Sequence, residues 1–279
     1  MDVSWVQKIL MSFVQGISEF FPISSSGCDI LLRRLLGVSS VDPLFSAMCL
    51  LGAMGVLTYL FHKELAVMTS ELLRLLGLKS RVRGQRPDRL QARRCLLWLT
   101  AAVPAMLAQL FSGVFDFING SMTLVALLWI LGGLCLFLSD RLAQGDKSDE
   151  AMTAGDALSC GIGYAIGAIP GFSQVGLGMC VGKVLGIRRF WVMQFALLVS
   201  LPSLLVRFLG NVVAVFSAGI TIYGPVEWLQ ALLGAVFCAL GSYIAISVMR
   251  FLGHRSSFGN FSFFCWGAGL FTFIVSLMS

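Results

Sequence analysis

Charged residues are scarce in this chain. Only 12% of its 279 residues are Asp, Glu, Lys or Arg, whereas 57% are hydrophobic and the mean hydropathy is +0.88. A soluble domain carries roughly 25% charged residues. The composition therefore excludes an ordinary soluble domain and predicts an integral membrane protein. The first residues also lack the pattern of a removable signal peptide, so we expect the first helix to stay in the mature protein.

Paired cysteines and histidine clusters are missing as well. The eight cysteines show no Cys-x-x-Cys spacing and stand mostly in apolar segments, and the chain has only two histidines. Buried free thiols behave as small hydrophobic side chains. The spacing therefore indicates neither a disulfide framework nor a zinc site.

The positive charge is concentrated in one loop. The net charge is +6, and residues 79–94 hold seven basic residues against one acidic residue, Asp88. No aromatic residue interrupts this run, which argues against nucleic-acid binding. Short loops rich in Lys and Arg remain on the cytoplasmic side of a membrane, where they meet anionic lipid headgroups. We therefore expect this loop to be cytoplasmic and expect no nucleic-acid partner.

Long apolar segments predict the transmembrane helices. A helix needs roughly 20 apolar residues to cross the bilayer, and six segments qualify: residues 42–61, 95–115, 121–138, 190–216, 226–250 and 259–278. Residues 63–78 are amphipathic and are expected to lie at the membrane interface. Because open strands cannot cross lipid, the pattern predicts an all-α polytopic membrane protein.

Two polar interruptions stand at corresponding places in the two halves. Residues 15–28 pack a carboxylate and three serines around a proline, and residues 168–178 again combine proline, glycine and serine. The apolar arms beside them are short for spans: residues 3–21, 23–37, 157–169 and 176–187. We therefore predict two re-entrant helical hairpins. The odd number of spans between them predicts an inverted repeat with a binding site near the midplane.

One polar stretch separates the two halves. We predict a first half at residues 1–138, a cytoplasmic linker at residues 139–156 and a second half at residues 157–279, all within one integral membrane domain. The linker joins repeats and separates no soluble domains.

The two motifs resemble those of the undecaprenyl-diphosphate phosphatase family, the bacitracin-resistance membrane phosphatases. The resemblance covers nearly the whole chain, and the first motif matches closely from Gln15 to Gly27. This chain departs from the family at three positions: Cys28 replaces a histidine, Gln174 replaces an arginine and Val175 replaces a serine. The resemblance implies a multi-pass protein of the bacterial plasma membrane that meets a polyprenyl diphosphate at the outer face.

The resemblance and the chemistry of the side chains together select candidate site residues. Glu19 is the candidate to hold a divalent cation, Mg²⁺ or Ca²⁺, or to act as general base, and Gln15, one helical turn earlier, is a second metal ligand. Ser25 is the candidate nucleophile or phosphate ligand, and Cys28 and Ser173 complete the catalytic set. The remaining candidates bind substrate: Ser24, Ser26, Gly27, Gly171, Gln174 and Gly176.

Each assignment has a plainer alternative. Glu19 could reach the membrane interface, and the serines could merely cap a helix. A neutral Cys28 thiol cannot replace an imidazole that carries protons. Asp29 either takes over as base or caps a helix. Lys183 either supplies the charge that Gln174 lacks, or it lines a polar cavity or reaches towards the interface.

Two functions follow from this sequence. The first is a membrane phosphatase that hydrolyses undecaprenyl diphosphate to the monophosphate, so that the lipid carrier returns to cell-wall synthesis. The second is a catalytically impaired member that binds or transports a polyprenyl phosphate without cleaving it. The partners expected in both cases are the lipid and the bilayer, with a homodimer as a further possibility.

Overall fold

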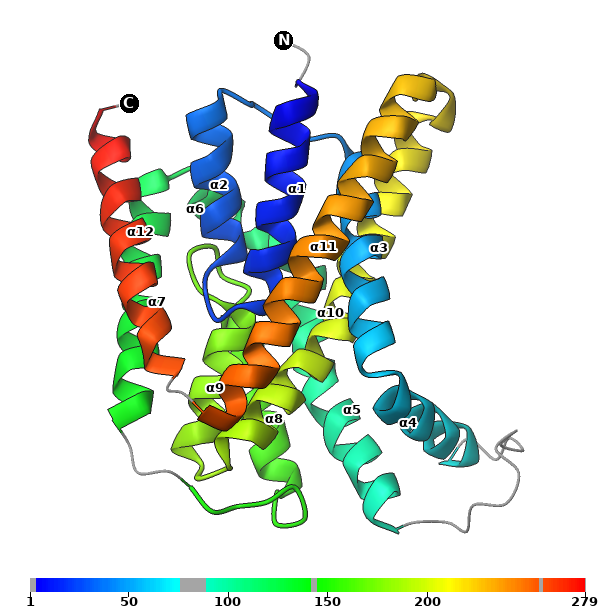
Figure 1. The fold of residues 1–279 in the computed structure, drawn as a ribbon, viewed down its shortest axis with the longest axis vertical. Coiled ribbons are helices and arrows are strands. Elements are labelled where there is room, and N and C mark those ends of the chain that lie inside the picture. The colour runs from blue at the N-terminus through cyan, green and yellow to red at the C-terminus, as the bar shows by residue number, and fades with distance from the viewer. Residues whose placement is uncertain (1–3, 76–88, 142–144, 256–257, 279) are drawn as a thin grey trace.

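The structure is a computed structural model that describes residues 4–75, 89–141, 145–255 and 258–278 (Figure 1). Five of its helices are long and apolar enough to cross a membrane: α3 (Pro43–Leu60), α7 (Met122–Arg141), α10 (Arg189–Ala218), α11 (Pro225–Arg255) and α12 (Phe261–Leu277). α5 (Arg89–Leu110) is followed, across a bend of 58°, by the 3-10 helix η1 (Ser112–Phe115) and the short α6 (Asp116–Asn119); this bent pair is either a broken sixth span or a re-entrant segment. The predicted all-α polytopic fold is confirmed.

The two predicted hairpins enter the bundle from opposite ends. The first consists of α1 (Trp5–Phe20) and α2 (Ser25–Leu36), and the second of α8 (Ala154–Ile166) and α9 (Gln174–Val184). Each arm has between 11 and 16 residues, which is short of the roughly 20 that a span needs. Figure 1 shows the first hairpin descending from the end that holds both termini and the second rising from the other end.

The two tips turn by the same local device. Ser24 caps α2, and its Oγ accepts a hydrogen bond from the N–H of Gly27 at 2.9 Å. Ser173 caps α9 in the same way, accepting from the N–H of Gly176 at 3.1 Å. A serine side chain in this position satisfies a backbone donor that has no partner within the helix. This recurrence of Ser-x-x-Gly is the local structural counterpart of the sequence repeat.

Small residues allow the first hairpin to lie directly on the bundle. A Cβ atom on Gly16 of α1 would stand 2.1 Å from the backbone oxygen of Cys238 in α11. On the next helix pair, a Cβ on Gly52 of α3 would stand 2.3 Å from the backbone oxygen of Ala235. The three backbones therefore pack at distances that only glycine permits, and this packing fixes the position of α1.

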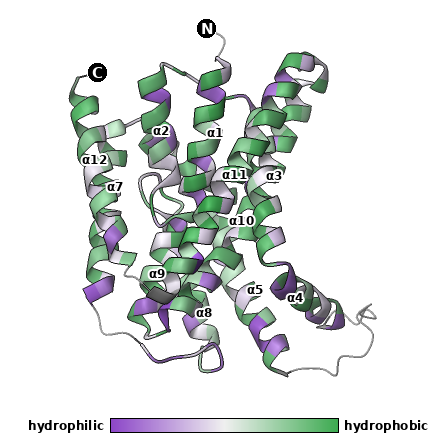
Figure 2. Cartoon of the chain, in the orientation of Figure 1, coloured by the Kyte–Doolittle hydropathy of each residue, from purple (hydrophilic) through white to green (hydrophobic). Residues whose placement is uncertain are grey.

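The amphipathic segment forms α4 (His62–Leu75), which projects sideways from the end of α3 (Figure 1). Its predicted last residues, 76–78, and residues 79–88 of the basic loop lie outside the described residues. Hydrophobic residues cover the long helices, and hydrophilic residues gather near the helix ends and around the hairpin tips (Figure 2). Around the predicted linker, α7 continues to Arg141 and α8 begins at Ala154.

Candidate functional site

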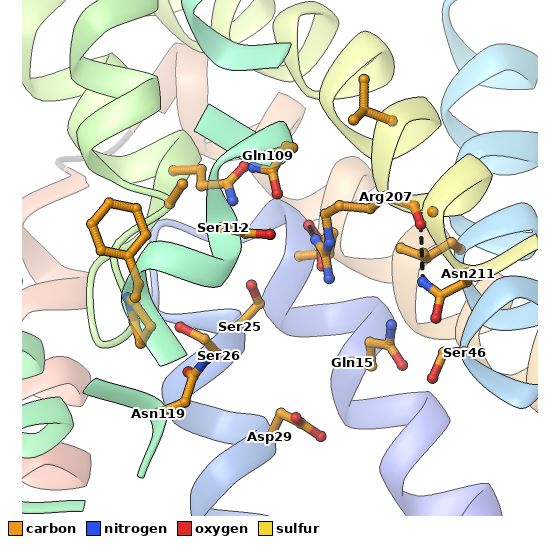
Figure 3. Close-up of a pocket in the computed structure, with 18 of the residues that line it drawn as sticks. Gln15, Ser25, Ser26, Asp29, Ser46, Gln109, Ser112, Asn119, Arg207 and Asn211 are labelled. Carbon is orange, nitrogen blue, oxygen red and sulfur yellow. Dashed lines mark hydrogen bonds and ion pairs between the residues drawn. The ribbon is translucent and has the colours of Figure 1, made fainter. Parts of the chain in front are cut away.

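A cavity of about 620 Å³ lies where the two hairpin tips meet. Its polar lining includes Gln15 and Glu19 from α1, Ser25 and Ser26 from α2, Gln174 from α9 and Arg207 from α10. Further polar side chains come from α3, α5, η1 and α6: Ser46, Gln109, Ser112 and Asn119. Figure 3 shows Gln15, Ser25, Ser26 and Arg207 around the same space. Arg33, in the last turn of α2, and Val41, after that helix, also line the cavity, so it extends from the tips towards the end of the bundle that holds the termini.

Glu19 and Arg207 form an ion pair at this cavity. The Arg207 guanidinium donates from Nη1 to Oε1 of Glu19 at 2.6 Å, and only 5% of the Glu19 side chain is exposed. Among the described residues, the second oxygen, Oε2, is buried and has no hydrogen-bond partner. Glu19 is therefore not an interfacial carboxylate, because it is held inside the bundle with one acceptor oxygen unused.

Sequence reasoning missed Arg207. A signal was present, because Arg207 is the only charged residue between positions 190 and 216, in a segment predicted to span the membrane. An ionisable residue inside a span is costly and commonly marks a functional position. The sequence alone did not show the partner of this charge, which the fold identifies as Glu19.

The three serines of the first motif have different surroundings. Ser24 is fully buried as the cap of α2, and Ser26 Oγ accepts a hydrogen bond from the N–H of Gly171 in the second tip at 3.2 Å. Ser25 lines the cavity, and its hydroxyl has no hydrogen-bond partner within the described part of the chain. Ser25 is therefore the serine that is available to a ligand.

The second motif also divides into supporting and lining residues. Ser173 caps α9 and donates to the backbone oxygen of Phe21 at 3.5 Å, so it joins the two tips. Gly171 has a φ of +98°, and a Cβ there would meet the backbone oxygen of Val125 at 2.6 Å, so this turn requires glycine. Gln174 lines the cavity, where its Oε1 accepts a hydrogen bond from Ser203 of α10 at 3.2 Å.

The structure does not bring Cys28 together with Glu19. Its side chain is buried among apolar residues that include Trp129 and Cys265, and it lines a separate apolar cavity of about 430 Å³ that involves α1 and α12. Gly27 beside it packs on Trp129, and Gly176 packs near Pro22. None of these three positions lines the cavity that holds Glu19.

Asp29 and Lys183, the possible replacements for the missing base and the missing arginine charge, each form an ion pair with another residue. Asp29 lines the cavity but forms an ion pair with Arg33, one turn later in α2. Lys183 is buried in α9 and pairs with Asp140 of α7, which also receives Arg189 at 3.2 Å. Lys183 therefore stabilises the junction of α7, α9 and α10 and does not reach Gln174.

A divalent cation fits this site only when the substrate supplies further ligands. The described residues contain no group of three or more His, Cys, Asp and Glu side chains that would form a metal cage. The unpartnered Oε2 of Glu19 and the carbonyl of Gln15 are nevertheless oxygen donors at one cavity. Mg²⁺ is commonly held by one or two carboxylates together with substrate phosphates. Glu19 and Gln15 would therefore hold an ion that arrives with a phosphate group.

Known proteins resemble this chain over nearly its whole length. A family model described as bacitracin resistance protein BacA matches residues 8–271. An undecaprenyl-diphosphatase of Carboxydothermus hydrogenoformans is 26% identical over 267 residues, 95% of this chain and 94% of the relative. An undecaprenyl-diphosphatase of Methanobrevibacter smithii is 27% identical over 282 residues and covers 99% of both chains. The similarity thus extends over both hairpins and all predicted spans.

Proposed function

Since this chain belongs to the bacitracin resistance protein BacA family, we propose that it hydrolyses undecaprenyl diphosphate, or a closely similar polyprenyl diphosphate, to the monophosphate and inorganic phosphate. One observation carries this proposal: a polar cavity inside a membrane domain joins a carboxylate, a guanidinium and a free hydroxyl at the meeting point of two re-entrant hairpins. Polar groups of this kind persist at membrane depth only where they meet protein, water or a ligand.

Each lining residue suits one part of the reaction. The hydroxyl of Ser25 and the amide of Gln174 donate hydrogen bonds to phosphoryl oxygens, and the side-chain acceptor Oε2 of Glu19 accepts the proton of the attacking water. Attack at the terminal phosphorus breaks its bond to the bridging oxygen and releases inorganic phosphate. A divalent cation bound with the substrate would neutralise phosphate charge beside Glu19 and Gln15. The caps Ser24 and Ser173 act by holding the tips in place.

The bundle ends suggest an orientation in the bacterial plasma membrane. The ends of α7 and α9 and the starts of α5, α8 and α10 lie at the end of the bundle opposite the termini (Figure 1), and Arg93, Lys147 and Arg188 stand in or next to these parts of the chain. Positively charged short loops favour the cytoplasmic side. The cavity, which extends towards the other end, would then be reached from the outer face.

A second function is favoured by one observation. Cys28 lies outside the cavity and Gln174 carries no charge, so two groups that the family resemblance associates with catalysis are absent from this site. In that case the chain would bind or move a polyprenyl phosphate without cleaving it. The two functions share a substrate and differ in whether phosphate is released.

Phosphate release by the purified protein in detergent tests the proposal. We expect release from undecaprenyl diphosphate with Mg²⁺ or Ca²⁺, a loss on chelation by EDTA, and a loss of about a hundredfold or more in Glu19→Gln. The matched control is Glu71→Gln, because Glu71 is also a buried glutamate paired with an arginine but lies in α4, outside the cavity. This variant should keep its activity.

Two results would contradict this proposal, the first by favouring the second function and the second by excluding Glu19. If the native chain binds the lipid but releases no phosphate under any metal condition, the phosphatase proposal fails. Equal activity of Glu19→Gln and the native chain would remove Glu19 from the mechanism. Transfer of labelled lipid between leaflets of vesicles that contain the native chain would then be the next measurement.

A further inference from the structure

Arg207 is held by the fold at the point where the two hairpins meet. It stands four residues after Ser203 in α10, and residues four apart lie on the same face of a helix. Ser203 bonds Gln174 at the start of α9, whereas Arg207 bonds Glu19 at the end of α1. One face of α10 thus contacts both hairpins, and Arg207 projects from that face into the cavity (Figure 3).

Among the described residues, two basic side chains line the cavity, Arg33 and Arg207. Arg33 is paired with Asp29 in its own helix, next to the outer part of the cavity. Arg207 pairs with Glu19, and Ser203 of the same helix bonds Gln174 of α9, so α10 places a cation beside the uncharged donors of the site. Because Gln174 contributes no charge, Arg207 is the basic side chain that the described residues place beside both Glu19 and the start of α9.

The guanidinium also has donors to spare. It carries five N–H groups in a fixed plane, and among the described residues its hydrogen bond to Glu19 uses one nitrogen, Nη1. Its side chain is 29% exposed, whereas that of Glu19 is 5% exposed. The carboxylate is thus enclosed while the guanidinium remains open to the cavity. Such an arrangement suits bidentate binding of a phosphate by the free edge of the fork.

We propose that Arg207 is the phosphate-binding cation of this site. Glu19 fixes the orientation of its guanidinium, whose remaining N–H groups bind the terminal phosphoryl group of a lipid diphosphate. Gln174 adds an uncharged donor to the same group. In this arrangement the positive charge comes from α10 of the bundle and not from the tip of the second hairpin. The inference rests on the proposed function for its substrate, but it concerns binding as well as hydrolysis.

Binding and hydrolysis are measured side by side to test this. Methylenediphosphonate with Mg²⁺, which cannot be hydrolysed at its carbon bridge, serves as the binding probe in isothermal titration. We expect Arg207→Gln to weaken its binding at least about tenfold and to lower kcat/KM for undecaprenyl diphosphate about a hundredfold or more. Arg207→Lys should fall between, because lysine keeps the charge but loses the fork.

Two controls separate binding from folding. Arg189 lies in the same helix as Arg207 and also pairs with a carboxylate, but it does not line the cavity. Arg189→Gln should therefore keep both probe binding and hydrolysis. Since Arg207→Gln leaves a buried carboxylate unpaired, binding is also compared between Glu19→Gln and the double variant Glu19→Gln, Arg207→Gln. The double variant contains no unpaired charge from this pair and should bind the probe more weakly than Glu19→Gln. Adding Gln174→Arg to the Arg207→Gln variant should restore binding of the probe.

The outcomes distinguish this inference from the phosphatase proposal. Arg207-dependent binding without any hydrolysis supports the phosphate-binding role and rejects the phosphatase. Normal hydrolysis together with equal binding by Arg207→Gln and Arg189→Gln overturns the role of Arg207 and leaves the phosphatase intact. Absence of both probe binding and hydrolysis in the native chain overturns both.

Discussion

The hydroxyl of Ser26 in the first hairpin accepts a hydrogen bond from the backbone N–H of Gly171 in the second, at 3.2 Å. This bond joins two tips that enter the bundle from opposite ends. Ser173 adds a second connection through the backbone oxygen of Phe21. The two tips are therefore in direct contact beside the cavity, and the geometry of the cavity depends on both halves of the chain.

Replacing Ser26 with alanine should weaken this contact. We expect Ser26→Ala to lower the free energy of unfolding by about 1 kcal/mol, since the N–H of Gly171 loses its acceptor. Thermal unfolding in detergent measures the change. Thr100→Ala is the control, because the half-buried Thr100 donates its hydroxyl hydrogen bond to the backbone of its own helix, at the oxygen of Leu96. Equal unfolding temperatures for the two variants would contradict the role of this bond.

The close packing of α1 on α11 predicts a strong effect at Gly16. Gly16→Ala forces a Cβ against the backbone oxygen of Cys238 at 2.1 Å, so the two helices must separate. We expect a loss of about 1–3 kcal/mol in stability, which is the usual cost of overpacking. Gly55→Ala, at a helical glycine with no atom within 4 Å of the added carbon, should leave stability unchanged or raise it. A similar melting temperature for both variants would be evidence against this packing.

The serines of the first motif should separate into two kinds by mutation. Ser25→Ala removes a hydroxyl from the cavity and should reduce phosphate release with little change in unfolding temperature. Ser24→Ala removes a helix cap and should cost about 1 kcal/mol of stability. Activity and thermal unfolding are compared for both variants. The assignment is wrong if Ser24→Ala is fully stable while Ser25→Ala is unstable and active.

Introducing histidine at position 28 should not create activity. The Cys28 side chain is packed among apolar residues outside the cavity, so an imidazole there would be both larger and more polar than its surroundings. We expect Cys28→His to leave phosphate release no higher than in the native chain and to lower stability by about 1–3 kcal/mol. A rise in kcat without a change in KM would show that position 28 does reach the reacting group.

Much of the fold was predictable from the sequence because single segments carry the signal. The long apolar segments predicted five helices that are long enough to span and the bent α5–α6 segment, and proline with glycine and serine predicted the two hairpin tips. These features depend on local hydrophobicity and on local breaks in a helix. The inverted arrangement followed from counting the spans between the hairpins.

The site was harder to predict because it depends on helical phase and on distant contacts. Ser25, Asp29 and Arg33 follow at intervals of four residues along the cavity face of α2, whereas Cys28 lies about 100° round the helix from Asp29. Proximity in the motif therefore did not place Cys28 in the cavity. The pairing of Glu19 with Arg207 joins residues 188 positions apart and becomes visible only in the folded chain.

The meeting of the hairpin tips has a consequence for the permeability of the membrane. Neither hairpin crosses the bilayer, so at that point the two aqueous faces are separated by the cavity, the tip contact and the body of the second hairpin. Below the tips, side chains such as Tyr164 and Met179 are almost completely buried. If the chain lies in the membrane as proposed, the tip contact and the packed side chains below it would close the polar cavity towards the other end of the bundle, so that the site would not become a path for protons or ions.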